Sequence, residues 1–137
     1  MAASMGIRVH ASHLEEGTMG LYSPDEARIY FDIRLTPNER RATIAHELGH
    51  AHYGHTCSAP AHERQAEVFA ARLLIDPAGY AALERVNADR HHIADELGVT
   101  AELIATFQAY CLTRVRGMTY AAPKMGFGQW AYRSARA

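Results

Sequence analysis

Two histidines and a glutamate share the stretch TIAHELGHAHYGH (residues 43–55) in the order H-E-x-x-H, as His46, Glu47 and His50. Residues four apart on a helix lie on one face, so both imidazoles can reach a single metal ion. Glu47 is turned about 100° around the helix axis, where it can take a proton from a metal-activated water without binding the ion. Gly49 leaves room for the close approach of backbone or substrate. The pattern predicts a hydrolytic zinc site; the alternative is an amphipathic helix whose histidines make ordinary hydrogen bonds.

A catalytic zinc ion needs a third protein ligand and one open position. One route is a further histidine, as in H-E-x-x-H-x-x-G-x-x-H, but Gly54 and His55 fall one residue out of that frame. The other route is an acidic residue on the next predicted helix, where Glu63 and Glu67 lie four apart and share a face. The mismatch favours the second route without eliminating the first.

Glu63 is the expected third ligand. In an antiparallel helical hairpin it lies level with His50, and Glu67 lies level with His46. Glu67 then suits a different task, which is to accept a hydrogen bond from the ring N–H of a ligating histidine and so fix its tautomer. The alternatives are the reverse assignment of the two glutamates and a Glu67 that is simply exposed to solvent.

Other potential ligands surround the predicted hairpin loop. His55 and His62 flank it and could line a cleft, although surface positions are the favoured interpretation. Cys57 lies in the loop, and a thiolate binds zinc well, but a free thiol is favoured there. Both cysteines, Cys57 and Cys111, are interpreted as free thiols in a reducing compartment.

A strand is predicted to lead into the motif. The segment RIYFDIRL (residues 28–35) alternates apolar and polar residues, which is typical of a half-buried strand. Its expected inward-facing residues are Ile29, Phe31, Ile33 and Leu35. A weaker strand is expected around residues 7–9.

Helices are expected over most of the remaining chain. Thr36, Pro37 and Glu39 form a capping-box signature that begins a helix at about residue 37, and Gly54 ends it. Periodicity and capping residues predict further helices at residues 61–75 and 77–86 and, with a turn at Gly98 and a cap at Thr100, within residues 91–115.

At 137 residues the chain has the size of one domain, expected over residues 1–137. Its expected parts are a small sheet at residues 5–36, a zinc-binding helical hairpin at 37–75, C-terminal helices at 77–116 and an irregular tail at 117–137, which would be a loop or a short strand. A net charge of −1 gives no overall field that attracts nucleic acid or an anionic membrane. The sequence has neither a signal-peptide pattern nor a membrane-span pattern, so a soluble, cytoplasmic protein is expected.

The chain resembles the ImmA/IrrE-type zinc metallopeptidases of phages, mobile elements and bacteria. The resemblance depends on the strand RIYFDIRL, the stretch TIAHELGHAHYGH and the following ERQAEVFAARLLIDP (residues 63–77). Family members carry E-x-x-A-N-x-F-A-x-x-L-L-x-P after their H-E-L-G-H helix. Here Glu67 stands where asparagine or aspartate is usual, and the end of the pattern is one residue longer. The match covers about residues 5–112.

The resemblance implies an α+β fold, a mostly helical zincin-like (gluzincin-like) domain with a small antiparallel β-sheet packed on the H-E-x-x-H helix. It also implies a zinc-dependent endopeptidase with Zn²⁺ as cofactor. Its protein substrate would be a helix-turn-helix repressor, in phage or mobile-element immunity or in stress regulation.

The expected mechanism places the substrate as an added strand along residues 28–35. Zinc polarises the scissile carbonyl, while Glu47 activates the water and passes its proton to the leaving amine. The candidates for stabilising the oxyanion are Tyr53, His55 and Tyr120.

Two other functions compete with proteolysis. Residues 93–107 also resemble a helix-turn-helix, which indicates a DNA-binding regulator. The predicted reading helix, residues 101–110, contains no lysine or arginine, and phosphate contacts supply most DNA affinity, so a packing role is favoured. The third function is that of a zinc-holding protein that binds a repressor without cutting it. Replacing Glu47 by glutamine separates these functions, because metal should stay while proteolysis is lost.

Overall fold

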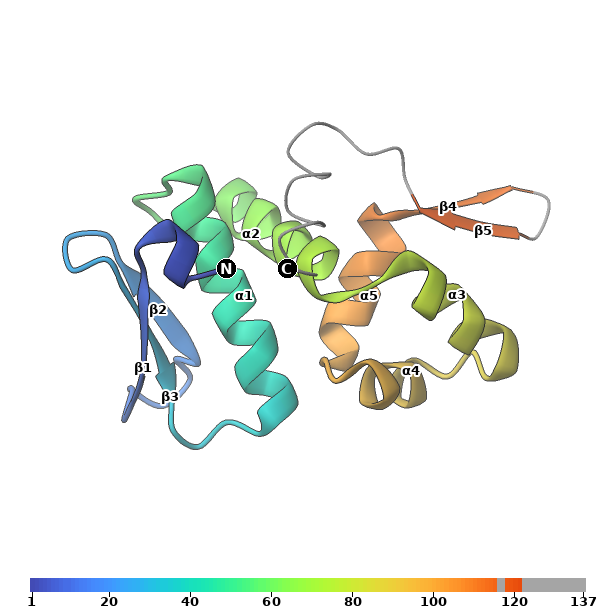
Figure 1. Cartoon of the computed structure of the whole chain (residues 1–137), viewed down its shortest axis with the longest axis horizontal. Coiled ribbons are helices and arrows are strands. Elements are labelled where there is room, and N and C mark those ends of the chain that lie inside the picture. The colour runs from blue at the N-terminus through green and yellow to red at the C-terminus, as the bar shows by residue number, and fades with distance from the viewer. Residues whose placement is uncertain (116–117, 122–137) are drawn as a thin grey trace.

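The computed structural model describes residues 1–115 and 118–121 (Figure 1). Its elements in chain order are a 3-10 helix η1 (Ala3–Met5), β1 (Arg8–Ser12), β2 (Gly20–Ser23), β3 (Arg28–Asp32), α1 (Pro37–Tyr53), α2 (Pro60–Leu74), α3 (Pro77–Val86), α4 (Arg90–Leu97), α5 (Ala101–Tyr110), β4 (Leu112–Val115) and β5 (Met118–Ala121). Helices predominate, and the strands form a three-stranded sheet and a separate hairpin of β4 and β5. The α+β class implied by the resemblance is confirmed.

The three-stranded sheet is mixed. β2 pairs with β3 in an antiparallel arrangement, whereas β1 pairs with the other side of β3 in parallel, with Val9 opposite Ile29. β3 lies between two strands that run in opposite directions, so it can be antiparallel to only one of them. The expectation of a purely antiparallel sheet is therefore wrong for β1.

The strand order β1-β3-β2 places β3 in the middle of the sheet. Its backbone groups are paired on both sides, so a substrate has no free edge along β3. The expectation that a substrate strand adds along residues 28–35 is therefore wrong. β2 is an edge strand, and it lies against α1.

β3 ends at Asp32, before the predicted end of the strand. The buried Asp32 carboxylate accepts hydrogen bonds from the backbone N–H and the guanidinium of Arg34, which turns the chain away from the sheet. These hydrogen bonds lower the pKa of Asp32 to about 2. Ile29 is fully buried as predicted, whereas Ile33, within the turn, is 52% exposed. The alternating pattern thus extends further than the strand.

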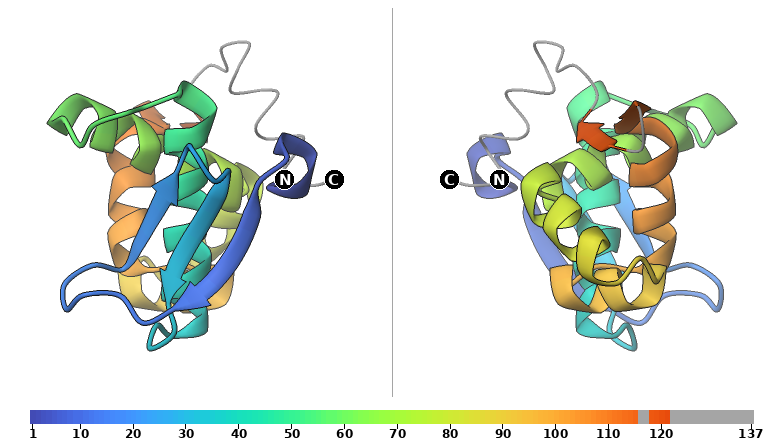
Figure 2. Two further views of the ribbon diagram at one scale, coloured as in Figure 1. Left: turned by 90° about the vertical axis from the view of Figure 1, so that its left-hand side faces the viewer. Right: turned by 90° about the vertical axis from the view of Figure 1, so that its right-hand side faces the viewer.

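α1 packs against the sheet on one side and against α2 on another. Figure 2 shows the sheet as a layer with the helices behind it. Thr36 and Glu39 form the predicted capping box, with the Thr36 N–H donating to the Glu39 carboxylate at 2.8 Å. Gly54 ends the helix in the left-handed conformation, with a φ of 68°. The helix therefore begins and ends where the sequence predicts.

α2 runs back along α1, and the two backbones approach closely at Gly49 and Ala66. A Cβ on Gly49 would lie 2.8 Å from the Cα of Ala66 and 2.9 Å from its carbonyl oxygen. The space predicted at Gly49 is thus occupied by the backbone of the neighbouring helix. The buried residues of α2 are Ala66, Phe69, Ala70, Ala71 and Leu73.

α3, α4 and α5 complete the core beside α2. Tyr80 of α3 and Phe107 of α5 are buried, and their ring centroids lie 5.1 Å apart. α5 also buries Leu103 and Ile104, and it packs against α2 and α4. This is the packing role favoured for the helix-turn-helix pattern. Among the described helices, none has both the length and the apolar character needed to cross a bilayer.

The last helix is shorter than predicted. The last helix ends at Tyr110, and β4 follows it where a helix was expected to continue towards residue 115. Thr113 and Val115 of β4 are β-branched, which favours a strand. β5 pairs with β4 within the segment from residue 117, for which a loop or a short strand is expected. Residues 122–137 lie outside the described part of the chain.

Candidate metal centre

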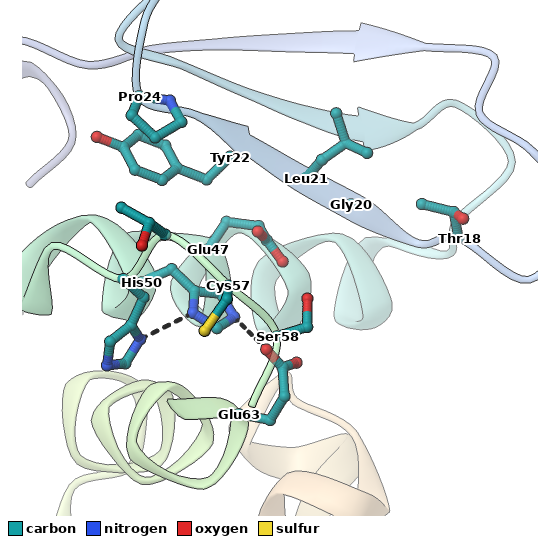
Figure 3. A pocket seen from close by; sticks show the side chains of 12 residues that line it. Thr18, Gly20, Leu21, Tyr22, Pro24, Glu47, His50, Cys57, Ser58 and Glu63 are labelled. Atoms are coloured by element: carbon teal, nitrogen blue, oxygen red, sulfur yellow. Dashed lines mark hydrogen bonds and ion pairs between the residues drawn. The ribbon is translucent and has the colours of Figure 1, made fainter. Parts of the chain in front are cut away.

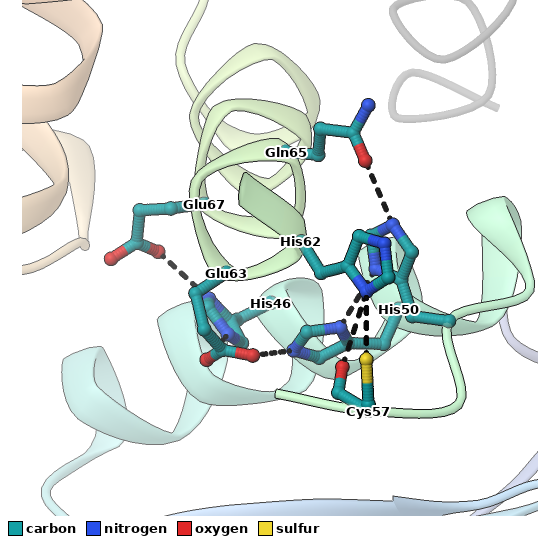
Figure 4. A network of polar contacts seen from close by, with 8 residues as sticks. His46, His50, Cys57, His62, Glu63, Gln65 and Glu67 are labelled. Atoms are coloured by element: carbon teal, nitrogen blue, oxygen red, sulfur yellow. Dashed lines mark hydrogen bonds and ion pairs between the residues drawn. The ribbon is translucent and has the colours of Figure 1, made fainter. Parts of the chain in front are cut away.

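The three predicted ligands meet between α1 and α2 (Figure 4). The Nε2 atom of His50 lies 2.8 Å from Oε2 of Glu63, and Nε2 of His46 lies 3.2 Å from Oε1 of the same carboxylate. One potential ligand atom from each residue lies within 4.8 Å of the other two. Over residues 1–115 and 118–121, no second group of histidine, cysteine and acidic side chains is gathered in this way.

The chemistry of this cluster fits a divalent transition metal. Two imidazole nitrogens and one carboxylate oxygen are a donor set of catalytic zinc sites, which leaves one position open. Neighbouring ligands around tetrahedral zinc lie roughly 3.3 Å apart, given metal–ligand bonds of about 2.0–2.1 Å. The separations of 2.8 and 3.2 Å are close to that value. Burial also lowers the pKa of His50, which favours the neutral, ligating form of its ring.

Glu67 contacts the other ring nitrogen of His46. Its Oε1 lies 3.2 Å from His46 Nδ1, on the side of the ring away from Glu63 (Figure 4). Burial, the largest single effect, would lower the pKa of His46, but the hydrogen bond and charge of Glu67, the charge of Glu47 and the contact with Glu63 together raise it. The structure therefore brings Glu67 to the position expected for a carboxylate that orients a histidine ligand.

Glu47 lies on the side of α1 that faces the sheet. Figure 3 shows its carboxylate between β2 and Glu63. Burial raises the pKa of Glu47 to about 7, the charge of Glu63 acts in the same direction, and His46 and a hydrogen bond with the Tyr22 backbone oppose the shift. A carboxyl group with a pKa near neutrality can both accept and return a proton at physiological pH.

Two adjoining cavities open beside Glu47, with volumes of about 360 and 790 Å³. Leu21, Tyr22 and Pro24 are among the residues that line the smaller cavity only. Glu39, Glu67 and Glu102 are among those that line the larger cavity only. The residues common to both cavities are Thr18, Gly20, Glu47, Ser58 and Glu63. The metal centre therefore lies in a groove that extends along β2 in both directions from Glu47.

Gly20 allows β2 to lie directly on α1. A Cβ at this position would collide with Cγ2 of Thr43 and would lie 3.1 Å from the carbonyl oxygen of Tyr30. In an antiparallel pair, the backbone groups of every second residue point towards the neighbouring strand. The Asp32 N–H donates to the Met19 carbonyl at 2.8 Å, so Met19 and, in the register of β2 and β3, Leu21 direct their backbone groups towards β3. By this alternation the groups of Gly20 and Tyr22 point to the free edge.

His55 is buried, at 8% exposure, and not on the surface as favoured from the sequence. Its Nδ1 lies 3.0 Å from Nδ1 of His50, and its Nε2 lies 2.8 Å from Oε1 of Gln65. Both ring nitrogens are thus engaged by neighbouring side chains. This placement disfavours His55 as a metal ligand and as the group that stabilises the oxyanion.

The other side chains around the loop lie near the centre in different ways. Cys57 is an exposed free thiol whose Sγ lies 3.5 Å from Nδ1 of His62. Tyr53, a candidate for oxyanion stabilisation, stacks on the ring of His55 with centroids 5.4 Å apart. Tyr120, another candidate, belongs to β5, and its side chain lies outside the described part of the structure.

Sequence reasoning missed the contact of His50 with His55 and the part played by Gln65. The signal was present in Gly54, because a left-handed glycine after a helix brings the next residue back onto the last turn. The N–H of His55 donates to the His50 carbonyl at 3.0 Å, and the N–H of Gly54 donates to that of Ala51 at 3.2 Å. These two bonds are those of a Schellman motif, in which the side chains of His50 and His55 face each other.

Comparison with known proteins gives one family. Residues 2–107, most of the chain, match the family described as IrrE N-terminal-like domain, within peptidase family M78. The matched region contains the sheet, the helical hairpin and the whole candidate metal centre. No curated protein matches the chain.

Proposed function

Because the chain belongs to the IrrE N-terminal-like (ImmA/IrrE) family of peptidases, we propose that it is a zinc-dependent endopeptidase acting on a protein substrate. The observation that carries the proposal is the convergence of His46, His50 and Glu63, with their ligand atoms within 4.8 Å, beside the buried carboxyl group of Glu47. His46, His50 and Glu63 would hold the metal ion, and Glu67 would orient His46.

When bound, a divalent ion such as Zn²⁺ supplies Lewis-acid activation of water and of a peptide carbonyl. Glu47 accepts the proton that the attacking water loses, and it delivers that proton to the nitrogen of the leaving amine. Its burial and its backbone hydrogen bond with Tyr22 hold the carboxyl group in place for both transfers. Glu47 is thus the proposed catalytic residue.

The groove along β2 would position the substrate. An extended peptide can pair with the outward-facing backbone groups of Gly20 and with the carbonyl of Tyr22, whose N–H is bonded to Glu47, as a strand added to the sheet. The cavities on both sides of Glu47 leave room for residues before and after the cleaved bond. This geometry supports cleavage within a chain over removal of a terminal residue.

The proposed substrate is a helix-turn-helix transcriptional repressor in the cytoplasm. The resemblance to ImmA/IrrE-type peptidases supports this choice, since such proteins act on repressors of phage, mobile-element or stress genes. A repressor with an extended segment near its folded domain would suit the edge strand β2.

The test begins with the metal. We expect purified wild-type protein and Glu47→Gln to bind close to one equivalent of Zn²⁺ per chain, and His46→Ala to bind none, in elemental analysis after dialysis. An equal metal content in wild type and His46→Ala would contradict the proposed site.

Proteolysis is tested with the same variants. Extracts of the natural host are incubated with zinc-loaded wild type or Glu47→Gln, and new peptide N-termini are labelled and identified by mass spectrometry. We expect cleavage of a helix-turn-helix repressor by the wild type alone. Equal cleavage by Glu47→Gln would remove the proposed catalytic role, and metal-dependent capture of an uncut repressor by the wild type would favour the non-proteolytic alternative.

A further inference from the structure

We infer that His55 and Gln65 act together as positioning residues that fix the tautomer of His50, so that its unprotonated Nε2 faces the metal position. The inference rests on the metal centre of the proposed function, but not on proteolysis. It concerns a chain of three side chains, His50, His55 and Gln65, which joins the end of α1 to the exposed face of α2.

The backbone brings His55 to His50. The Schellman motif at Gly54 folds residue 55 back onto the last turn of α1, with the His55 N–H bonded to the His50 carbonyl. In most such motifs the two facing side chains make an apolar contact. Here two imidazole rings face each other instead, and their Nδ1 atoms lie 3.0 Å apart.

Stacking holds the ring of His55 in one orientation. The His62 ring lies parallel to it, with centroids 4.0 Å apart and an angle of 8° between the planes. The ring of Tyr53 stacks at 5.4 Å and 15°. With His55 only 8% exposed, its two nitrogens stay directed at His50 and Gln65.

The direction of the hydrogen bonds follows from Gln65. Its Oε1 faces Nε2 of His55 at 2.8 Å, and an amide oxygen can only accept, so Nε2 carries the proton. A neutral His55 then has a lone pair on Nδ1, which accepts a hydrogen bond from Nδ1–H of His50. His50 in turn has no proton on Nε2.

This tautomer points two lone pairs at each other across the metal position. His50 Nε2 and Oε2 of Glu63 lie 2.8 Å apart, and two acceptors at that distance need a positive charge between them. A metal ion supplies that charge. The reverse direction, with Gln65 donating its amide N–H, would put a proton on Nε2 of His50 and block its coordination.

The two histidine ligands are thus held by different chemistry. The charged carboxylate of Glu67 contacts Nδ1 of His46 directly, whereas a neutral pair, His55 and Gln65, holds His50. Direct contact of a carboxylate with a ligating histidine raises its basicity, and a neutral acceptor orients the ring with less effect on charge.

Substitutions of Gln65 test the inference. Gln65 is exposed, so its replacement leaves the core intact. Gln65→Glu can only accept, so we expect it to bind Zn²⁺ at least as tightly as the wild type in competition with a chromophoric chelator. Gln65→Leu has no acceptor, and we expect its affinity to fall by about tenfold, the lower end of the range for such residues because water can replace part of the bond.

A matched control is Gln108→Leu, which removes a glutamine bonded to Tyr80, away from the metal centre. We expect its zinc affinity to equal that of the wild type. An affinity of Gln65→Leu within twofold of the wild type, or an equal loss in Gln108→Leu, would overturn the inference.

The tautomer is measured directly in zinc-loaded wild-type protein. A long-range ¹⁵N–¹H NMR correlation of the histidine rings should show a proton on Nε2 of His55 and none on its Nδ1. A proton on Nδ1 of His55 and none on Nε2 would refute the inferred tautomer, whatever the zinc affinities of the variants. Zinc binding without proteolysis would leave this inference standing, whereas a wild-type protein that binds no metal overturns both the inference and the proposed function.

Discussion

Gly49 and Ala66 lie in direct backbone contact, so that a Cβ on Gly49 would be 2.8 Å from the Cα of Ala66. Gly49 immediately precedes the proposed ligand His50, and Ala66 follows Glu63 by about one helical turn. The contact therefore sets the distance and the register of α1 and α2 at the point where their side chains meet. The position of the Glu63 carboxylate relative to both histidines depends on it.

Gly49→Ala should destabilise the protein although alanine is the better helix former. The added methyl group meets backbone atoms that cannot turn away, and overpacking of this kind costs about 1–3 kcal/mol. Separation of the helices should also weaken zinc binding. Urea unfolding and chelator competition measure the two effects.

The matched control is Gly79→Ala in α3, where the nearest atom to an added Cβ is 3.4 Å away. We expect it to leave stability unchanged or to raise it by up to about 1 kcal/mol, since alanine restricts the unfolded chain.

Combining Gly49→Ala with Ala66→Gly should restore little stability, because the closest contacts are with the Cα and carbonyl oxygen of residue 66. A full rescue would show that the close approach is not one of backbones.

Gly20→Ala should push β2 away from α1 and disturb the groove, because its Cβ would collide with Cγ2 of Thr43. We expect a loss of about 1–3 kcal/mol in the free energy of unfolding. Thr43→Ser removes that methyl group and should recover much of the loss in the double variant. A double-mutant cycle of urea unfolding energies gives the coupling, and additive effects would contradict the proposed collision.

The metal-free protein should lose stability relative to Glu47→Gln as the pH rises. The pKa of Glu47 is about 7 in the folded protein and near 4.5 ordinarily, so between these values the folded state keeps a proton that the unfolded chain has released. Relative to Glu47→Gln, the free energy of unfolding of the wild type should therefore fall from about pH 4.5 to 7 and then level off. The full difference is on the order of 3 kcal/mol.

Unfolding of both proteins in the presence of a chelator, at several pH values, measures this difference. Glutamine carries no charge, so the variant lacks this contribution at every pH. If the free energies of unfolding of the two proteins differ by the same amount at every pH from 4.5 to 7, Glu47 ionises in the folded state as it does in the unfolded chain.

Glu63→Gln and Glu67→Gln should weaken zinc binding to different extents. Glu63 faces Nε2 of both histidines, whereas Glu67 contacts Nδ1 of His46. Loss of an orienting carboxylate costs about 10–100-fold in affinity, and loss of a ligand should cost more. The two substitutions are chemically identical and lie one turn apart on α2, so each controls for the other. The reverse order of affinities would exchange the two assignments.

Local sequence patterns predicted the helical hairpin and the cluster within it. The capping box at Thr36 sets the start of α1, and helical spacing then places His46 and His50 one turn apart. A short loop and a second periodic helix are enough to bring Glu63 beside them. These relationships span few residues, and each depends on geometry that every helix shares.

The errors concern contacts that no local pattern encodes. The position of β3 between β1 and β2 depends on the pairing of distant strands, and the alternation in residues 28–35 is compatible with an edge or a centre. His55 was interpreted as a surface residue because its burial requires the turn at Gly54, the ring of His62 and the amide of Gln65 together. Each residue alone is ordinary at its position.

All the residues assigned to the metal and to proton transfer lie between His46 and Glu67, within one helix–loop–helix segment. The strand that would carry the substrate is separate in sequence, and it lies against this segment through residues that include Gly20 and Tyr22. Changes in the sequence of β2 could therefore alter which peptides bind, while the proposed metal ligands and Glu47 stay the same. One helical hairpin could in this way serve different substrates, each selected by the four residues of a neighbouring strand.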